Sequence, residues 1–276
     1  MRAVADAYFV RRQNRGLVMN ALRGNGPLSR TQIASLTGLS NASITAISTE
    51  LLAQRIVLEG PPPAKAGQRG RPAVELALRR DAFHLAMVEL DVTRARFSLA
   101  NYAGILVDRV ETPVSPGMFT ATPPALFLAQ WVQHLKERNP AEGQTLSALA
   151  ISAQGMLDRQ ASTLNWSPIP DLADKPIVAP LAQEFGIPVT LQKRCVLLAR
   201  GARLLYPQFG DEPIAALFLG STVAMGVNLP GRTDSGATEF GHMNHIPDGA
   251  RCRCGQRGCI EAYAADYGVL RLAYGV

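Results

Sequence analysis

Apolar residues near the start of the chain recur at helical spacing and predict short helices between residues 11 and 60. A Gly-Asn-Gly-Pro stretch ends the first of these helices. Ser29 and Gln32 have the spacing of a capping box at the start of a second helix. Gly38 then permits a tight turn, after which Ser40 can cap a third helix. The apolar residues expected to face inward are Leu17, Val18, Leu22, Ile33, Leu36, Ile44, Ile47 and Leu51.

Two helices joined by a short turn that contains glycine form the helix-turn-helix arrangement of many DNA-binding domains. A small helical bundle with capped helices is the alternative interpretation. Apolar and polar positions then alternate as in two strands, at 55–60 and 73–79. The basic Pro- and Gly-rich segment between these strands would form the tip of a wing that enters the minor groove, a flexible linker between domains, or both.

From His84 onwards, segments with strand patterns alternate with segments of helical spacing. The expected strands are 84–92, 94–104, 105–114, 146–152, 188–192 and 214–220, and the expected helices are 123–138, 176–186 and 195–206. Strands that alternate with helices in this way predict an α/β fold.

Charge is distributed unevenly along the 276 residues. Residues 1–80 hold 12 Lys/Arg and 4 Asp/Glu, a net charge of +8, whereas residues 81–276 carry a net charge of −2. A basic module on a near-neutral body indicates a polyanionic partner such as double-stranded DNA, although an ordinary basic surface would have the same composition. The candidate DNA-binding residues are Asn41, Ser43, Thr45 and Ser48, expected on the outward side of the third helix, with Arg69 and Arg71 in the wing.

Composition also bears on the compartment. No run approaches the roughly 20 apolar residues that span a bilayer, and the N-terminus lacks the apolar stretch of a signal peptide. Three of the four cysteines cluster between residues 252 and 259, which favours a metal site over a disulfide framework, with three buried free thiols as the alternative. We therefore expect a cytoplasmic protein that does not bind membranes.

Three stretches together resemble the ROK family, which contains repressors and sugar kinases. They are GPLSRTQIASLTGLSNASIT, the Gly-Arg-Pro of the wing, and EFGHMNHIPDGARCRCGQRGCIEAY. The resemblance covers nearly the whole chain and implies an actin-like, RNase-H-like two-lobed ROK domain of the α/β class behind a winged helix-turn-helix. The expected domains are 1–80 for DNA binding and 81–276 for the ROK domain, with a first lobe at about 81–192 and a partial second lobe at about 193–276.

The resemblance also implies a zinc ion. In the matching family motif one histidine and three cysteines hold the metal, and these correspond to His242, Cys252, Cys254 and Cys259. Four such ligands close a tetrahedral shell and leave no position for water, so the zinc would be structural. His245 is the competing histidine ligand.

The family's sugar site is partly retained. The resemblance places Glu239, His242 and Glu261 around the sugar, and Asn165 and Trp166 in a loop that supplies further contacts. Supporting the metal loop is the alternative role for the two glutamates.

Three features of the family's kinases are missing from this chain. The Asp-x-Gly-Gly-Thr turn reads Asp-Val-Thr-Arg at 91–94, and β-branched residues interrupt a second glycine-rich loop at 220–226. The Asn and Asp of the catalytic Glu-Asn-Asp sequence become Lys193 and Arg194, and a guanidinium cannot act as a general base at neutral pH. Arg194 would either pair with Glu239 or Glu261 and close an empty cleft, or help to bind an anionic effector.

We therefore expect a transcriptional regulator, acting as a repressor of carbohydrate metabolism genes, that is not an enzyme. It would bind operator DNA as a homo-oligomer, a dimer or tetramer, under the control of a sugar or sugar-derivative effector. A ROK sugar kinase with an added DNA-binding module and a metal sensor are the alternatives. Family members carry roughly a hundred further residues after the zinc motif, so we expect an incomplete second lobe that exposes apolar surface to a partner.

Overall fold

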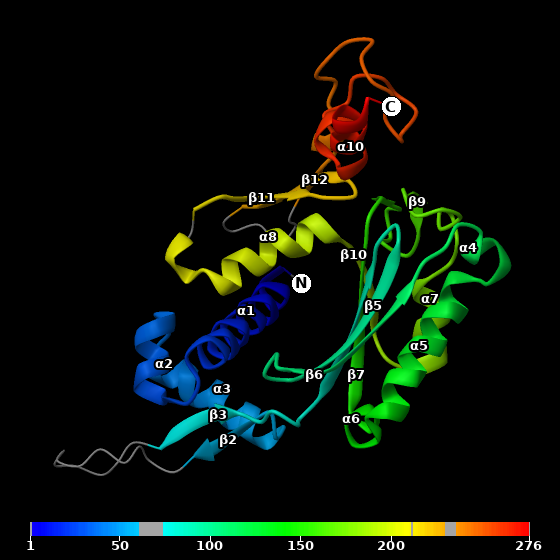
Figure 1. Cartoon of the computed structure of the whole chain (residues 1–276). Helices are drawn as coiled ribbons and strands as arrows, with labels where there is room; N and C mark the ends of the chain where they lie inside the picture. Colours follow the sequence, from blue (N-terminus) through cyan, green and yellow to red (C-terminus); the bar gives the residue numbers. More distant parts are fainter. Residues whose placement is uncertain (1, 61–73, 211, 230–235, 276) are drawn as a thin grey trace. The chain divides into compact units, whose positions relative to one another are not determined.

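The computed structural model describes residues 2–60, 74–210, 212–229 and 236–275 (Figure 1). The chain divides into two compact units. The first comprises Met1–Leu85, Ala100–Val107 and Pro140–Leu146, and the second comprises Ala86–Leu99, Asp108–Asn139 and Ser147–Val276. The predicted domain boundary at residue 80 stays a prediction.

The first unit contains a helix-turn-helix followed by two antiparallel strands. Its elements are α1 (Arg2–Asn25), β1 (Leu28–Ser29), α2 (Arg30–Thr37), α3 (Asn41–Ala53), β2 (Val57–Gly60) and β3 (Glu75–Leu78). The strands form one sheet in the order β1-β3-β2. The two-residue strand β1 was not predicted, and α1 is longer than expected. The wing tip, with Arg69 and Arg71, lies outside the described residues.

Local side-chain bonds explain where α2 and α3 begin. The Ser29 hydroxyl accepts the Gln32 backbone N–H at 3.3 Å, and the Gln32 side chain accepts the Ser29 N–H at 2.8 Å, which confirms the capping box. Gly38 ends α2 with a φ of 70°, in the left-handed region that glycine adopts readily. Ser40 accepts the Ser43 N–H at 3.2 Å and begins α3.

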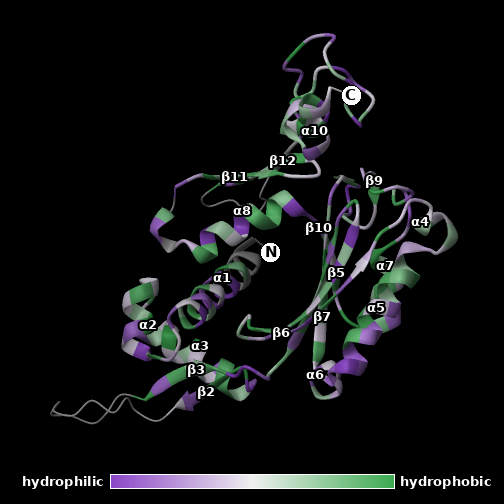
Figure 2. Cartoon of the chain, in the orientation of Figure 1, coloured by the Kyte–Doolittle hydropathy of each residue, from purple (hydrophilic) through white to green (hydrophobic). Residues whose placement is uncertain are grey.

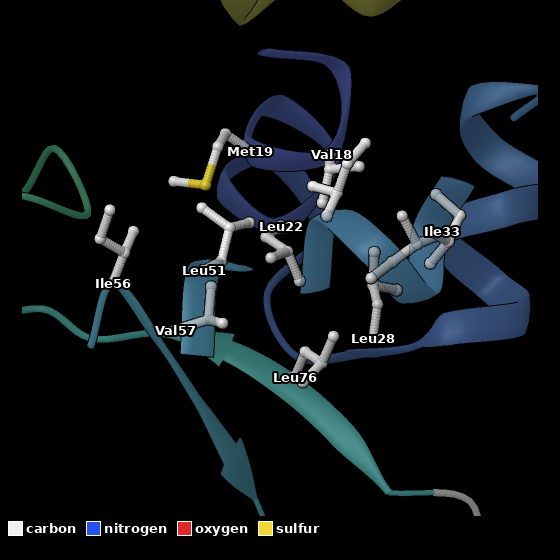
Figure 3. Close-up of a cluster of buried hydrophobic side chains, with 11 residues drawn as sticks. Val18, Met19, Leu22, Leu28, Ile33, Leu51, Ile56, Val57 and Leu76 are labelled. Atoms are coloured by element: carbon white, nitrogen blue, oxygen red, sulfur yellow. The ribbon is translucent and has the colours of Figure 1, made fainter. Parts of the chain in front are cut away.

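The helices and strands of the first unit enclose an apolar core (Figure 3). Its buried members are Val18, Met19, Leu22, Leu28, Ile33, Ile44, Ile47, Leu51, Ile56, Val57 and Leu76. The inward placement of Leu17 and Leu36 was wrong, because these side chains are 40% and 57% exposed. The core-facing side of α2 lies between Ile33 and Ala34, so Leu36 points about 110° away from it at 100° per residue.

Removing the Ser29 cap should loosen α2 without changing its core contacts. We expect Ser29→Ala to lower the local stability of α2 by about 1 kcal/mol, since one backbone N–H loses its partner. Native-state hydrogen exchange of the α2 amides measures this change directly. Thr49→Ala is the control, because that exposed hydroxyl bonds only the Thr45 carbonyl within α3. Equal protection in Ser29→Ala and wild type would contradict the prediction.

A five-stranded sheet in the order β10-β7-β4-β5-β6 begins the α/β part of the chain, and every strand predicted there is present. The strands are β4 (His84–Leu90), β5 (Arg94–Asn101), β6 (Leu106–Pro113), β7 (Leu146–Ala153) and β10 (Val189–Lys193), and the accompanying elements are α4 (Met118–Ala121), α5 (Pro124–Arg138), α6 (Pro140–Gln144), β8 (Met156–Leu157), β9 (Leu164–Trp166) and α7 (Val178–Phe185). β10 runs parallel to β7, which brings the ends of both strands to one edge.

Aromatic side chains fasten α5 to the sheet. Phe97 of β5 stacks on Trp131 with ring centroids 5.7 Å apart and meets the edge of Phe127 at 6.1 Å. Phe97 is fully buried. In Figure 2, hydrophobic residues run along β7 and alternate with hydrophilic ones along α5, as expected for a buried strand and an amphipathic helix.

The rest of the second unit carries the chemistry-bearing residues. Its elements are α8 (Arg194–Leu205), η1 (Pro207–Phe209), β11 (Ile214–Leu219), β12 (Val223–Asn228), β13 (Gly236–Thr238), η2 (Phe240–His242), α9 (Glu261–Ala264) and α10 (Asp266–Tyr274). The strands form an antiparallel sheet in the order β11-β12-β13, and α8 packs on it.

Large apolar side chains are exposed on β11 and α10. They are Leu217, Leu219, Val269, Leu270, Leu272 and Tyr274. That a partner covers them stays a prediction. None of the described helices combines the length and the apolar character that a membrane span requires.

Candidate functional site

Four metal-ligating side chains meet between η2 and α9. One ligand atom from each of His242, Cys252, Cys254 and Cys259 lies within 4.8 Å of all the others. Cys252 Sγ is 3.6 Å from His242 Nδ1, and the sulfurs of Cys254 and Cys259 are 3.7 Å apart. The competing residue His245 is exposed and does not belong to this cluster.

A tight turn brings the cysteines together. Cys252 N–H donates to the Gln256 carbonyl at 2.8 Å, and Gly255, with a φ of 91°, lets the chain reverse between them. Gly258 also has a positive φ, and a Cβ there would collide with the Ile246 carbonyl oxygen. The glycines therefore permit the reversal that places Cys254 and Cys259 side by side.

Two of the distances between the four donors suit a tetrahedral metal ion. With bonds of about 2.0–2.3 Å, neighbouring nitrogen and sulfur donors of a tetrahedral zinc site lie about 3.5–3.8 Å apart, and the two distances above fall in this range. Four imidazole and thiolate donors fill the shell and leave no position for a reacting water. The site can hold a metal, and such a metal would brace the loop.

Two neighbouring side chains, Tyr267 and Glu261, contact the sulfur of Cys252. The Tyr267 hydroxyl donates to Cys252 Sγ at 3.6 Å, and Glu261 Oε1 lies 3.7 Å from the same sulfur. Burial raises the pKa of Cys252, and it raises the pKa of Cys259 to about 12. Since metals bind thiolates, loading of the site must release protons.

A small pocket lies next to the cluster. It is lined by Ala153, Gln154, Gly155, Trp166, Pro168, Lys193, Arg194, Cys195, Phe218, Thr222, Val223, Ala224, Glu239, His242 and Glu261. Water molecules can occupy about 50 Å³ of it, room for about three or four of them rather than for a monosaccharide. The pocket is narrow and partly open to solvent in this conformation.

Most of the residues predicted to bind an effector line this pocket. Glu239 keeps 45% of its side chain exposed, whereas Glu261 is buried and accepts the Val223 N–H at 3.1 Å. The His242 ring meets the Trp166 ring edge-on, with centroids 5.5 Å apart. Asn165 is exposed and is not one of the lining residues. Trp166, predicted in the same loop, does line the pocket, because successive residues of β9 point to opposite sides.

The predicted partner of Arg194 was wrong. Arg194 donates to Asp91 Oδ2 and to the Leu90 carbonyl, both at 2.9 Å, and its guanidinium lies 5.2 Å from the centre of the Phe218 ring. Lys193 pairs with Glu239 instead, with Nζ 2.6 Å from Oε1. Adjacent residues at the start of a helix point in different directions, and only Lys193 faces Glu239.

Asp91 is held by groups from separate segments. Arg194 Nη1 and the Ser221 hydroxyl donate to its two carboxylate oxygens at 2.9 and 3.0 Å, and the Val92 N–H donates at 2.7 Å. Burial alone would raise the pKa of Asp91, but the hydrogen bond and positive charge of Arg194 outweigh burial and leave the pKa below its usual value. Asp91 is therefore the ionised partner of a buried ion pair.

On α3 the predicted outward face needs one correction. Asn41 and Thr45 are exposed and Ser43 is partly exposed, but Ser48 is fully buried and donates to the Ile44 carbonyl at 2.6 Å. Ser48 follows Ile44 by four residues, so the helical repeat places both on the core side. Thr49 is the exposed residue that continues the Asn41 and Thr45 stripe, and the same repeat could have identified it.

The structure defines an α/β chain with an N-terminal helix-turn-helix, a His/Cys cluster and a pocket beside it. The family model described as "ROK family" matches residues 87–274, and the chain belongs to the ROK family. The chain is 28% identical over 272 residues to the DNA-binding transcriptional repressor Mlc of Escherichia coli (strain K12), covering 96% of this chain and 66% of Mlc.

Two other proteins are similar to this chain, one over about half of it and one over nearly all of it. Glucokinase of Streptomyces coelicolor is 30% identical over 135 residues, which cover 48% of this chain and 43% of the glucokinase. The crystal structure of a ROK family transcriptional regulator, a homologue of the E. coli Mlc protein, superimposes with a TM-score of 0.73 at 22% identity. It covers 96% of this chain and 67% of that chain, which confirms the fold. The chain thus spans about two thirds of the length of these regulators.

Proposed function

We propose that this protein is a DNA-binding transcriptional repressor without kinase activity. The pocket of its ROK domain would bind a sugar-like effector. The observation that carries the proposal is the Arg194–Asp91 ion pair, at the position of the family's catalytic base. The match to a protein described as a DNA-binding transcriptional repressor, over 96% of the chain, supports the same function. We also propose that the protein binds a DNA operator and the effector as a homo-oligomer, a dimer or tetramer.

The contacts of Asp91 argue against phosphoryl transfer. Asp91 stands in the first turn and Ser221 in the later loop, the two segments that hold phosphate in the family's kinases. The Ser221 hydroxyl donates to Asp91, and Asp91 also pairs with Arg194. The guanidinium cannot accept a proton from a sugar hydroxyl. A kinase with an added DNA-binding module is the second candidate, which the similarity to a glucokinase favours.

Nucleotide turnover separates these two functions. We expect no ADP release above background when the purified protein is mixed with ATP, Mg²⁺ and each of a set of hexoses, because the base position holds an arginine. A coupled assay with an authentic glucokinase as positive control measures this. ADP release that requires both a hexose and the folded protein would establish kinase activity instead.

The first unit would bind DNA through α3. Asn41, Thr45 and Thr49 form an exposed polar stripe at intervals of four residues, suited to base edges in the major groove. Arg71, in the predicted wing, would contact phosphate or the minor groove. The net charge of +8 on residues 1–80 supplies the electrostatic attraction.

Different variants should distinguish residues that recognise the DNA sequence from residues that contribute affinity for any DNA duplex. With duplexes selected by the full chain from a random pool, we expect Asn41→Ala and Thr45→Ala to change the preferred sequence. Arg71→Ala should weaken binding to all duplexes and reduce the salt slope by about one unit. Ser48→Ala is the matched control, since that hydroxyl is buried. Undiminished DNA binding after removal of residues 1–80 would refute this role.

Zinc is the metal proposed for the His242, Cys252, Cys254 and Cys259 cluster, because it prefers a set of one imidazole and three thiolates. A metal sensor is the alternative. A sensor must exchange its ion at cellular concentrations, whereas a closed, largely buried four-ligand shell favours permanent retention. Retention of zinc through prolonged dialysis against a weak chelator supports the structural role.

A further inference from the structure

Unpartnered polar atoms concentrate at one place in the structure. Among the described residues, the buried side-chain nitrogen and oxygen atoms without a hydrogen-bond partner are Gln154 Nε2, Gln154 Oε1 and Arg194 Nε. Both residues line the pocket beside the metal cluster, and each is only 7% exposed. Arg194 Nε lies 3.7 Å from Glu89 Oε1 in an ion pair, so the Gln154 carboxamide is the group left open. Buried polar groups are normally satisfied, so an open carboxamide on a residue that lines the pocket points to a ligand.

Gln154 is held in place by its backbone rather than by its side chain. It follows directly after β7, and its carbonyl accepts the Ser167 hydroxyl at 2.8 Å. Gly155 comes next with a φ of 137°, packed so closely on the Trp166 carbonyl that no side chain fits there. Gln154 thus lines the pocket from a fixed backbone position, and its carboxamide offers a donor group and an acceptor group side by side.

The charged lysine, arginine and glutamate side chains that line the pocket already have partners within the protein. Lys193 pairs with Glu239 and Arg194 pairs with Asp91. The remaining lining carboxylate, Glu261, accepts the Val223 N–H. Among the described lining residues no cation is left to neutralise an anionic ligand, so the ion pairs disfavour sugar acids and sugar phosphates.

We propose that Gln154 recognises the effector and that the effector is a neutral hydroxylated molecule, such as an uncharged monosaccharide. A hydroxyl both donates and accepts, so one or two neighbouring hydroxyls satisfy the two ends of the carboxamide. The inference rests on the proposed effector function of the pocket. Because the pocket is too narrow for a monosaccharide, it must widen on binding, and the ion pair between Lys193 and the half-exposed Glu239 is the lining contact expected to open.

The test compares wild type with Gln154→Met, which keeps the length of the side chain and removes its polar atoms. Calorimetry and thermal unfolding are measured with D-glucose, D-xylose and N-acetyl-D-glucosamine, and with the anions D-glucuronate and glucose 6-phosphate. We expect at least one neutral sugar to bind and the variant to bind it about tenfold more weakly, the loss expected for two neutral hydrogen bonds. Gln133→Met, on the exposed side of α5, is the matched control.

A second readout separates recognition from a structural role. Without sugar, Gln154→Met should unfold at the same or a higher temperature than wild type, because replacing an unsatisfied buried amide by an apolar group costs little. A clearly lower unfolding temperature of the sugar-free variant would overturn recognition in favour of a structural amide.

The remaining outcomes are also decisive. Equal sugar affinity in wild type and Gln154→Met would overturn the role of Gln154 while the effector function stands. Tighter binding of glucuronate or glucose 6-phosphate than of glucose would overturn the neutral class. Binding of none of the five compounds to wild type would overturn the effector function itself, and the role of Gln154 with it.

Discussion

Replacing Cys254 by serine is expected to remove the metal and to lower the unfolding temperature of the second unit together. Serine is a poor ligand for zinc, and the three remaining donors then leave the shell open. Structural zinc contributes about 10–16 kcal/mol of apparent binding free energy in small zinc domains. Loss of only about 4 kcal/mol corresponds to a shift of about 10 °C for a unit of this size.

Metal content and unfolding must be measured on the same samples. Elemental analysis should give one zinc per chain in wild type and a small fraction of that in Cys254→Ser. Cys195→Ser is the matched control, since Cys195 is also buried but lies outside the cluster. It should retain the zinc. Wild-type protein purified without chelator and found free of zinc would contradict the proposal, as would a Cys254→Ser variant with full metal content.

The fold was largely predictable because its signals are local. The capping box at Ser29 and Gln32, the left-handed Gly38 and the alternating strands each depend on a few neighbouring residues, and the structure contains them all. The short strands β1, β8 and β9 have too few residues for a recognisable period. Their positions depend on pairing with distant segments, which periodicity does not report.

The pocket was less predictable, because its contacts join residues far apart in the chain. The spacing of the three cysteines pointed to the metal cluster, and the family resemblance supplied the histidine. Lys193, not Arg194, pairs with Glu239, and this depends on where each side chain points after β10 ends. The partner of Arg194, Asp91, is 103 residues away in the chain. Gln154 carries no motif at all. Its importance depends on the absence of partners around it among the described residues.

Replacing Arg194 by methionine should destabilise the second unit by about 3 kcal/mol at neutral pH, because it leaves the Asp91 carboxylate in a buried site without its cation. The side chains of Arg194 and Asp91 are only 9% and 16% exposed, so water cannot replace the lost partner fully. Arg138→Met is the control. Its pair with Asp108 leaves Arg138 49% exposed and should contribute only about 0–1 kcal/mol.

The pH dependence identifies Asp91 as the group responsible. In wild type the pKa of Asp91 lies below its unfolded value, so its contribution is present above about pH 4 and is lost as the pH falls through the folded pKa. In Arg194→Met the lowering by Arg194 is lost, while burial still raises the pKa of Asp91 and the hydrogen bonds from Val92 and Ser221 still lower it. The pKa of Asp91 is therefore higher in the variant than in wild type, and protonation of the carboxyl at acid pH removes part of the cost of its lost partner. The difference in unfolding free energy should therefore be largest near neutrality and shrink towards acid pH. Adding Asp91→Asn to Arg194→Met should restore part of the stability at pH 7 and flatten this dependence. A difference that stays constant between pH 4 and pH 7 would show that lost packing, such as the contact with Phe218, causes the destabilisation instead.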